Sequence, residues 1–383
     1  MPLERLQLTN FRGFESLDLS FEPDLTVLVG VNGCGKTSVL DVLAIGFGLR
    51  TSKPQDVRTN ADKATIMMQV DGIDHGIRIP GPALHHPSDL PETLALFYTV
   101  NRAVTDQTPG TTRPRAWGKE DARMKGGSDP YSELFSWIRE AEDAENEKVR
   151  FEKGSEDPQL RAVRHAVKRL MPGHTNLRVR RRGAMGDSRP RLTIEKDGEA
   201  LLFDSLSEGE RTLIAMIADI ARRLAIYYPE ADDPLVQPCL LVIDEFEQHL
   251  HPQWQREFPL RLREVFPGAQ MILTTHSPIV VSELLPQHLR AIKDFRLLEG
   301  AHREGQDVNE ILEALFGTPS RNVRTQKLIA AIHEAIDEDR LDDAATKLEA
   351  LAAQLGSDDP EVVRLTTIHR MLGAIDDDAV SQG

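Results

Sequence analysis

The sequence is poor in cysteine, in aromatic residues and in long apolar runs. Its 383 residues include two cysteines, Cys34 and Cys239, and both lie inside segments that we predict to be core elements. This scarcity argues against a disulfide framework, and neither cysteine has a partner at metal-ligand spacing. No apolar run approaches the roughly 20 residues that a membrane span needs, and the first residues show no signal-peptide pattern. These absences predict a cytoplasmic protein with no membrane contact.

Positive charge is also in deficit, since the formal net charge is −15. This balance argues against non-specific wrapping of nucleic acid. The charge is uneven, however: ten basic residues and one acidic residue lie from Arg161 to Arg191, whereas thirteen acidic and four basic residues lie from Ala331 to the end. The pattern predicts a basic patch and a separate acidic surface.

Two interpretations stay open for each charged region. The stretch Arg178–Arg191 either contacts the backbone of DNA or RNA or forms a solvated hairpin, and no aromatic residue interleaves with it. The acidic helices of 331–361 either bind a protein, such as a basic nuclease or a second protomer, or present a solvated face.

What the chain does contain is a complete phosphate-binding loop. Residues 30–37 follow the pattern G-x-x-x-x-G-K-T, between an apolar run (25–29) that predicts a strand and a segment (38–43) that predicts a helix start. Backbone N–H groups of such a loop surround phosphates at a helix N-terminus. We expect Lys36 to reach the β- and γ-phosphates and the Thr37 hydroxyl to bind Mg²⁺. The residues expected to hold ATP here are Gly30, Asn32, Gly33, Cys34, Gly35, Lys36, Thr37 and Ser38.

Three further motifs follow in the order that an ATPase of the ABC type requires. Residues 206–211 (Leu-Ser-Glu-Gly-Glu-Arg) resemble the ABC signature at a helix start, and the apolar strand 239–243 ends in Asp244 and Glu245. A third strand ends at His276. We expect Asp244 to hold Mg²⁺, Glu245 to polarise the attacking water, and His276 to sense the γ-phosphate. Each motif is weak alone, but the ordered set predicts an enzyme that hydrolyses ATP.

The ABC resemblance implies how the signature is used. ATPases of the ABC type place their signature against the nucleotide that a second subunit binds. Ser207, Gly209 and Glu210 are therefore expected to bind ATP held by another protomer, in a homodimer or a higher homo-oligomer with ATP at the interface. Contacts with the γ-phosphate would then hold the dimer together, and hydrolysis would release it.

The order of predicted elements indicates five regions. Residues 1–100 form an N-terminal ATPase lobe with the phosphate loop, and residues 101–175 a long loop and a helical insertion with helices near 131–153 and 158–170. Residues 176–300 form a C-terminal lobe that carries the signature, the acid pair and the histidine. Residues 301–375 form a helical segment for partner binding, with three amphipathic helices in 322–372, and residues 376–383 form a disordered tail.

Two stretches narrow the family. Residues 6–14 (Leu-Gln-Leu-Thr-Asn-Phe-Arg-Gly-Phe), followed by 29–33, resemble the SMC and RecF group of ATPases. Residues 243–255 resemble the I-D-E-P-E-x-H-L-H-P pattern of OLD-like and abortive-infection ATPases, with Phe246 in place of the proline. The resemblance covers about 1–100 and 200–285. It implies an α/β fold, an ABC-type phosphate-loop ATPase head with a helical insertion, and a C-terminal all-α segment.

The C-terminal part decides between members of this group. OLD nucleases carry a Toprim domain with a D-x-D pair on a strand end, but Asp337–Asp339 ends a predicted amphipathic helix, so we reject it as a metal site. There is no H-N-H cluster. Residues 307–317 and the helices of 322–372 are similar to the ATPase subunit of Septu-type defence systems, and related ATPases accompany some retrons. That resemblance implies a separate HNH nuclease as partner.

Three functions stay open on these grounds. The first is an ATPase that regulates or scaffolds a separate nuclease in anti-phage defence, and the second is a RecF-like ATP-gated DNA-binding protein of recombination or repair. The third is an ATP-dependent scaffold with negligible turnover.

The family also implies a polar residue that senses Mg²⁺, for which Gln69 and Asn101 are candidates. Arg58 and Arg102 either contact phosphate or a protomer, or are surface arginines.

Overall fold

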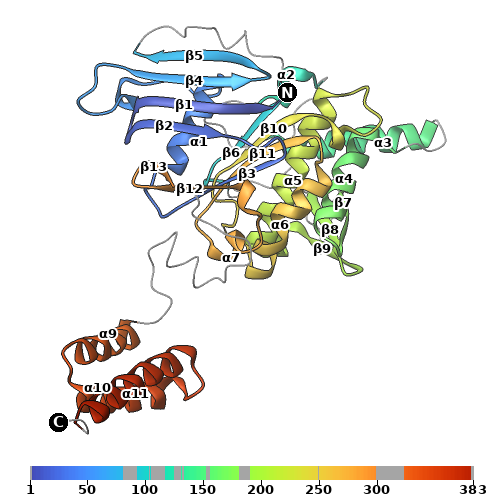
Figure 1. Ribbon diagram of the computed structural model, residues 1–383. Helices are drawn as coiled ribbons and strands as arrows, with labels where there is room; N and C mark the ends of the chain where they lie inside the picture. The colour runs from blue at the N-terminus through green and yellow to red at the C-terminus, as the bar shows by residue number, and fades with distance from the viewer. Residues whose placement is uncertain are drawn as a thin grey trace. The chain divides into compact units, whose positions relative to one another are not determined.

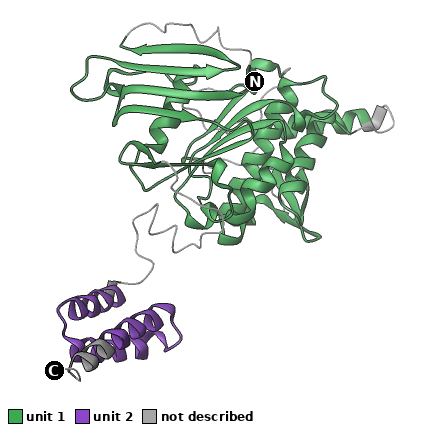
Figure 2. Ribbon diagram, viewed as in Figure 1, with its two compact units in different colours: residues 1–316 green, residues 317–383 purple. Residues whose placement is uncertain are grey.

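The computed structural model describes residues 2–80, 93–102, 104, 117–124, 131, 133–151, 156–180, 190–248, 250–298 and 323–380. Two compact units divide the chain, residues 1–316 and residues 317–383 (Figure 2). The first unit is α/β, and the described residues of the second, 323–380, form helices joined by short turns, as the sequence predicts. Among the described helices, none is long and apolar enough to span a membrane.

An antiparallel sheet opens the first unit, with strand order β2-β1-β4-β5. Its strands are β1 (Leu3–Phe11), β2 (Phe14–Ser20), β4 (Ala64–Val70) and β5 (Ile73–Ile79). Alternate residues of β1 and β2 are buried, and the register sets Leu6 opposite Leu19 and Leu8 opposite Leu17. This alternation is the pattern of a sheet with one face on the core. It confirms both strand pairs predicted from the sequence, around the turns at 12–13 and 71–72.

A six-stranded sheet forms the centre of the first unit, in the order β13-β12-β3-β11-β10-β6 (Figure 1). Its strands are β3 (Leu25–Val29), β6 (Ala95–Tyr98), β10 (Cys239–Ile243), β11 (Ala269–Thr275), β12 (Leu289–Lys293) and β13 (Arg296–Leu298). All neighbouring pairs are parallel except β12 with β13. The register places Val29 beside Thr275 and Ile243 beside Tyr98. The carboxyl ends of β3, β6, β10 and β11 therefore meet at one edge.

Two hydrophobic clusters cover the two faces of this sheet. Successive strand residues point to opposite faces, so that Leu241 and Ile243 belong to one cluster and Leu240 and Val242 to the other. The second cluster contains α1 (Lys36–Gly46) and the apolar face of the antiparallel sheet. The first contains α3 (Leu134–Phe151), α4 (Pro158–Leu170), α5 (Glu208–Tyr227) and α6 (Pro252–Val265). The segment predicted as a helical insertion thus packs into the same core as α5.

Smaller elements complete the first unit. A three-stranded antiparallel sheet has the order β7-β8-β9, from β7 (His174–Arg180), β8 (Arg191–Lys196) and β9 (Glu199–Leu202). Short helices lie at α2 (Lys119–Ala122) and α7 (Pro278–Val281). The pair β12–β13 was not predicted from the sequence. Most of the long loop predicted at 101–130 lies outside the described residues.

The second unit consists of α9 (Val323–Asp337), α10 (Leu341–Leu355) and α11 (Pro360–Val380). These are the three helices predicted, around a small core of Ile332, Leu348, Leu351, Val362 and Leu365. The Glu361 N–H donates to the Asp359 carboxylate at 2.9 Å, which caps α11. One prediction differs: the helix continues to Val380, where we expected a disordered tail from residue 376. Propagation of a helix that has already begun adds one hydrogen bond per residue, and aspartate does not break it as glycine or proline does.

Candidate functional site

The phosphate loop leads from β3 into α1. The Lys36 ammonium donates to the carbonyl oxygens of Gly30, at 2.6 Å, and Val31, at 3.1 Å. The N-cap residue of α1 is Gly35, which has no side chain to satisfy the first N–H groups of the helix. These donors and the helix dipole together suit an anion. Asn32 and Gly33 are exposed at the tip of the loop.

Two positions of the loop require glycine because atoms of other residues lie close to the loop backbone there. A Cβ atom at Gly30 would lie 2.2 Å from the Ile292 carbonyl oxygen and 2.7 Å from the Cys34 sulfur. At Gly35, where φ is +115°, a Cβ atom would lie 2.6 Å from the Phe14 ring. Cys34 is thus a buried part of the loop's frame. The Ser38 hydroxyl accepts a hydrogen bond from Arg12 at 3.2 Å.

The acid pair at the end of β10 adjoins the loop. The Thr37 hydroxyl lies 3.1 Å from one carboxylate oxygen of Asp244, and the Thr274 hydroxyl donates to the other at 2.6 Å. No group of three or more histidine, cysteine or acidic side chains in the described residues is arranged to hold a metal. One carboxylate and one hydroxyl still fit Mg²⁺, which in such sites takes its remaining ligands from water and substrate phosphates.

Glu245 has an unusual backbone for a residue with a side chain. Its φ is +44°, in the left-handed region, which costs a non-glycine residue roughly 1–2 kcal/mol. Its N–H donates to the Thr274 hydroxyl at 2.7 Å. Within the described part of the chain, the half-buried Glu245 carboxylate makes no hydrogen bond or ion pair. The side chain is therefore available at the edge of the sheet where the loop and Asp244 lie.

His276 follows β11 at the same edge. Its side chain is 45% exposed, and its Nδ1 atom lies 3.1 Å from the Glu247 carboxylate. The backbone N–H of His276 donates to the same oxygen at 2.7 Å. Glu247 itself is buried. No role for Glu247 was predicted from the sequence, although it is the second glutamate of the I-D-E-P-E-x-H-L-H-P pattern on which the family resemblance rests.

Arg102 is buried beneath the acid pair. Its guanidinium donates to the carbonyl oxygens of Asp244 and Glu245, both at 2.5 Å, and of Thr99 at 3.1 Å. The interpretation of Arg102 as a surface arginine is therefore wrong. Arg58, by contrast, is partly exposed and pairs with Glu15 at 3.0 Å.

The two candidates for the polar Mg²⁺ sensor lie in different sheets. Asn101 follows β6, whose carboxyl end adjoins that of β10. Gln69 belongs to β4, in the antiparallel sheet, opposite Arg5 and Asp74. The topology therefore places Asn101 at the edge that carries Asp244.

The signature segment forms the start of α5. Ser207 is its exposed N-cap: the hydroxyl accepts from the Glu210 N–H at 3.3 Å and donates to the Glu210 carboxylate at 2.8 Å. Glu210 also contacts Lys196 at 2.7 Å and His174 at 3.3 Å. Partial burial raises the pKa of Glu210, but hydrogen bonds from Lys196 and Ser207 outweigh it and bring the pKa to about 2. Glu210, expected to bind ATP, here serves a capping box.

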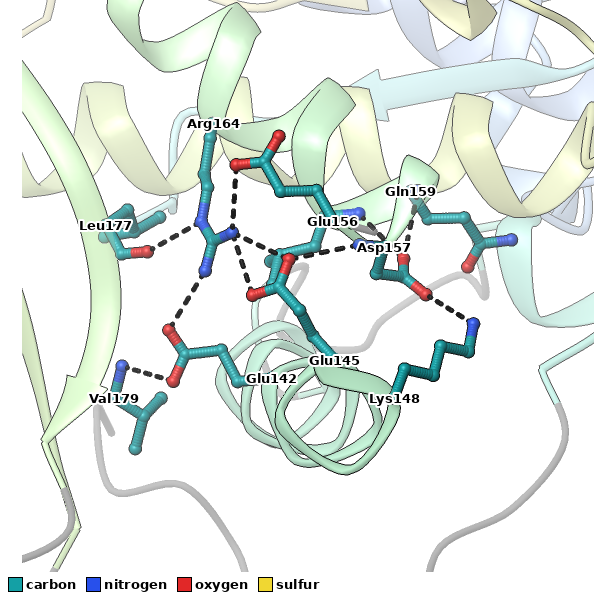
Figure 3. Close-up of polar contacts among 10 residues, drawn as sticks. Glu142, Glu145, Lys148, Glu156, Asp157, Gln159, Arg164, Leu177 and Val179 are labelled. Atoms are coloured by element: carbon teal, nitrogen blue, oxygen red, sulfur yellow. Dashed lines mark hydrogen bonds and ion pairs between the residues drawn. The ribbon is translucent and has the colours of Figure 1, made fainter. Parts of the chain in front are cut away.

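Among the described basic residues of the predicted patch, Arg164 is the one that is not exposed. Arg164 lies in an internal cluster with Glu142 at 3.3 Å and Glu145 at 3.0 Å (Figure 3). Arg191 pairs with Asp204 at 2.9 Å. The described basic residues of the patch that are exposed are Arg161, Lys168, Arg169, Arg178, Arg180 and Arg191. Arg181, Arg182 and Arg189 lie outside the described residues, as do His249 and the segment 307–317.

Comparisons with known proteins agree with this geometry. Residues 122–282 match the family model described as "AAA domain, putative AbiEii toxin, Type IV TA system", and residues 1–74 match the model described as "AAA ATPase domain". The chain is 27% identical to the Retron Ec83 probable ATPase of Escherichia coli, over 94% of this chain and 85% of that protein. It is 24% identical to the Septu protein PtuA of Bacillus thuringiensis, over 88% of this chain and 90% of that protein.

Solved structures also resemble the chain. A crystal structure of the SmcHead bound to the C-winged helix domain of ScpA aligns with a TM-score of 0.47 and 15% identity, over 78% of this chain and 96% of that one.

Proposed function

We propose that this chain, which belongs to the AAA ATPases, binds ATP with Mg²⁺ and hydrolyses it to ADP and phosphate at the carboxyl edge of its six-stranded sheet. The observation that carries the proposal is the convergence of three segments at that edge. The loop residue Thr37 is within 3.1 Å of Asp244, and Thr274 bonds both Asp244 and the Glu245 backbone.

The residues have distinct roles in this proposal. Lys36 and the N–H groups of the loop bind the phosphates, and Thr37 with Asp244 holds Mg²⁺, which supplies neutralisation of the phosphate charge. Glu245 orients the attacking water, and His276 contacts the γ-phosphate. The loop residues Gly30, Asn32, Gly33, Cys34, Gly35 and Ser38 shape the cradle.

A second protomer completes the site in this proposal. The exposed N-terminus of α5, with Ser207 and Gly209, would meet the nucleotide of its partner. A 20-residue helix supplies unpaired N–H groups and a dipole at that end. Glu210 forms the capping box of this helix with Ser207, and its contact with the ATP of a partner stays a prediction.

We further propose that the ATPase regulates or scaffolds a separate nuclease in anti-phage defence. The similarity to proteins described as a retron ATPase and as a Septu protein supports this assignment. The second unit is the candidate docking module, because α11 exposes Val363 (50%) and Met371 (63%). The competing function, ATP-gated binding of DNA, is supported by the exposed Arg161, Lys168, Arg169, Arg178 and Arg180 on α4 and β7.

A direct test measures ATP hydrolysis by the purified full-length chain. Wild type is expected to hydrolyse Mg²⁺-ATP, Lys36→Ala to lose nucleotide binding, and Glu245→Gln to bind nucleotide but lose turnover. A wild-type chain that binds no ATP would contradict the proposal. Turnover that survives Glu245→Gln would contradict the role of Glu245.

The partner is tested by affinity purification of the tagged chain from its native cells with mass spectrometry. A nuclease in near-equal amount supports the defence complex, and its loss on deletion of 323–380 would place the contact in the second unit. Recovery of DNA, or of recombination proteins alone, would favour the DNA-binding function.

A further inference from the structure

The turn at residues 244–248 carries Asp244 and Glu245, and it begins where β10 ends. β6 lies beside β10 in parallel register, with Tyr98 opposite Ile243. The Asp244 N–H continues this ladder by donating to the Tyr98 carbonyl at 2.8 Å. The strand pairing ends at that point, so the backbone groups of the turn need other hydrogen-bond partners.

Arg102, in the segment that follows β6, supplies hydrogen-bond donors to the turn. One planar guanidinium reaches two consecutive carbonyl groups, those of Asp244 and Glu245. A rigid fork of this kind fixes the orientation of both peptide groups at once, which a lysine ammonium does not. Arg102 is 3% exposed, so it is enclosed beneath the turn. Its effect on Glu245 is to hold the left-handed backbone from which the carboxylate projects.

Glu247 belongs to the same turn and contacts His276, which follows β11. One oxygen of its carboxylate accepts from the backbone N–H of His276 at 2.7 Å, and the Nδ1 atom of the same residue lies 3.1 Å from that oxygen. An ionised carboxylate can only accept, so a neutral ring that bonds to it from this position does so through Nδ1–H, which leaves Nε2 as the acceptor. The His276 side chain is 45% exposed while Glu247 is 4% exposed, so a buried carboxylate contacts a ring that is partly open to solvent.

Several groups besides Glu247 surround the Arg102 guanidinium. Burial lowers its pKa, and the nearby Tyr131, Glu247, Asp244 and Glu245 raise it without outweighing the burial. Arg102 is 3% exposed and Glu247 is 4% exposed, so neither is exposed enough to contact substrate.

We propose that Arg102 and Glu247 are positioning residues of the ATPase site: Arg102 fixes the Asp244–Glu245 backbone, and Glu247 fixes the tautomer and orientation of His276. The inference rests on the proposed function of this site.

The first test uses substitutions with matched controls. Arg102→Met and Glu247→Ala are expected to lower kcat roughly 10- to 100-fold, with nucleotide affinity changed less than about threefold, as for other groups that orient a catalytic centre. Arg102→Lys should be intermediate, and Glu247→Gln should retain most activity because its amide oxygen still accepts. The controls are Arg164→Met and Glu142→Gln in the buried cluster of Figure 3.

The controls separate positioning from stability. Arg164→Met and Glu142→Gln are expected to lower the melting temperature by amounts comparable to the test variants and to leave kcat per folded molecule unchanged. If Arg102→Met or Glu247→Ala changes kcat no more than its control, the inference is wrong. Should Arg102→Met fail to fold, the ratio of kcat between Arg102→Lys and wild type decides, and an unchanged kcat there contradicts the role of Arg102.

A second test needs no ATP hydrolysis, so it distinguishes failure of this inference from failure of the proposed function. In NMR spectra of ¹⁵N-histidine-labelled chain at pH 8, the signal lost in His276→Gln identifies His276. It is expected to show the Nδ1–H tautomer in wild type and to lose it in Glu247→Ala. A neutral His276 with its proton on Nε2 in the wild-type chain, or a signal unaffected by Glu247→Ala, would overturn the inference even in an active ATPase.

Discussion

The phosphate loop and the turn after β10 hold their reactive groups in different ways. The loop is fixed by its own neighbours: Lys36 bonds carbonyls five and six residues away, and Gly35 supplies the cap position of α1. The turn is fixed by residues that are distant in sequence, since Arg102 lies 142 and 143 residues from Asp244 and Glu245. Local geometry can be encoded in a short motif, whereas long-range support depends on the whole sheet being assembled.

The largest effect should come from crowding the loop against Ile292 of β12, which is a long-range contact of the otherwise locally held loop. Gly30→Ala would bring a Cβ atom 2.2 Å from a backbone oxygen that cannot move aside. We expect nucleotide binding to be lost, which a titration with a fluorescent ATP analogue would measure. Gly72→Ala, in the turn between β4 and β5, is the matched control, because no atom lies within 4 Å of its Cβ position and only its φ of +75° opposes the change. Its cost should be about 1 kcal/mol. Equal binding by both variants would contradict the importance of the close approach.

An intermediate effect should follow from removing one long-range support. Thr274→Val keeps the shape of a buried β-branched side chain but removes the donor to Asp244 and the acceptor for the Glu245 N–H. We expect kcat to fall roughly 10- to 100-fold, measured with steady-state ATPase kinetics. Thr26→Val is the control: Thr26 is equally buried, on β3, and its hydroxyl accepts from the Glu22 N–H at 2.8 Å. A similar loss of turnover in both variants would mean that Thr274 acts only through stability.

The smallest effect concerns the signature segment, which is held both by a local contact and by a contact from a distant strand. Glu210 caps α5 locally through Ser207 and is bound by Lys196 from β8. Because its pKa falls from the usual 4.5 to about 2 on folding, the charged carboxylate stabilises the fold above pH 4.5, and this contribution declines as pH falls from 4.5 towards 2. Glu210→Gln should lower the melting temperature by a few degrees at pH 7. Thermal unfolding at several pH values checks the prediction, and a wild-type advantage that grows below pH 4.5 would contradict it.

The sequence predicted those features that short patterns encode. The order of strand, loop and helix at 25–46 and the apolar runs of β10 and β11 were correct, and so were the three helices of the second unit. The pattern Ser207-x-x-Glu210 is also that of a capping box, and the structure shows this box at the start of α5. The assignments of Lys36, Thr37, Asp244, Glu245 and His276 to ATP and Mg²⁺ stay predictions until hydrolysis is measured.

Other features could not be predicted because they depend on tertiary packing. β12 and β13 are short and carry charged residues, and β12 is a strand because it pairs with β3. Nothing near Arg102 in the sequence distinguishes it from a surface arginine. Its place is set by the parallel register of β6 with β10. Glu247 was visible in a motif, but its bond to His276 spans 29 residues and two strands.

The hydrogen bond between Thr37 and Asp244 has a consequence for the order in which ligands bind. The chain offers Mg²⁺ one carboxylate and one hydroxyl that already bond each other at 3.1 Å, so a bare ion would have to disrupt that contact in exchange for two ligands. An ion that arrives already coordinated by triphosphate brings most of its ligands with it. The nucleotide and its metal should therefore enter as one complex, and free Mg²⁺ in the absence of nucleotide should leave the thermal stability of the chain unchanged.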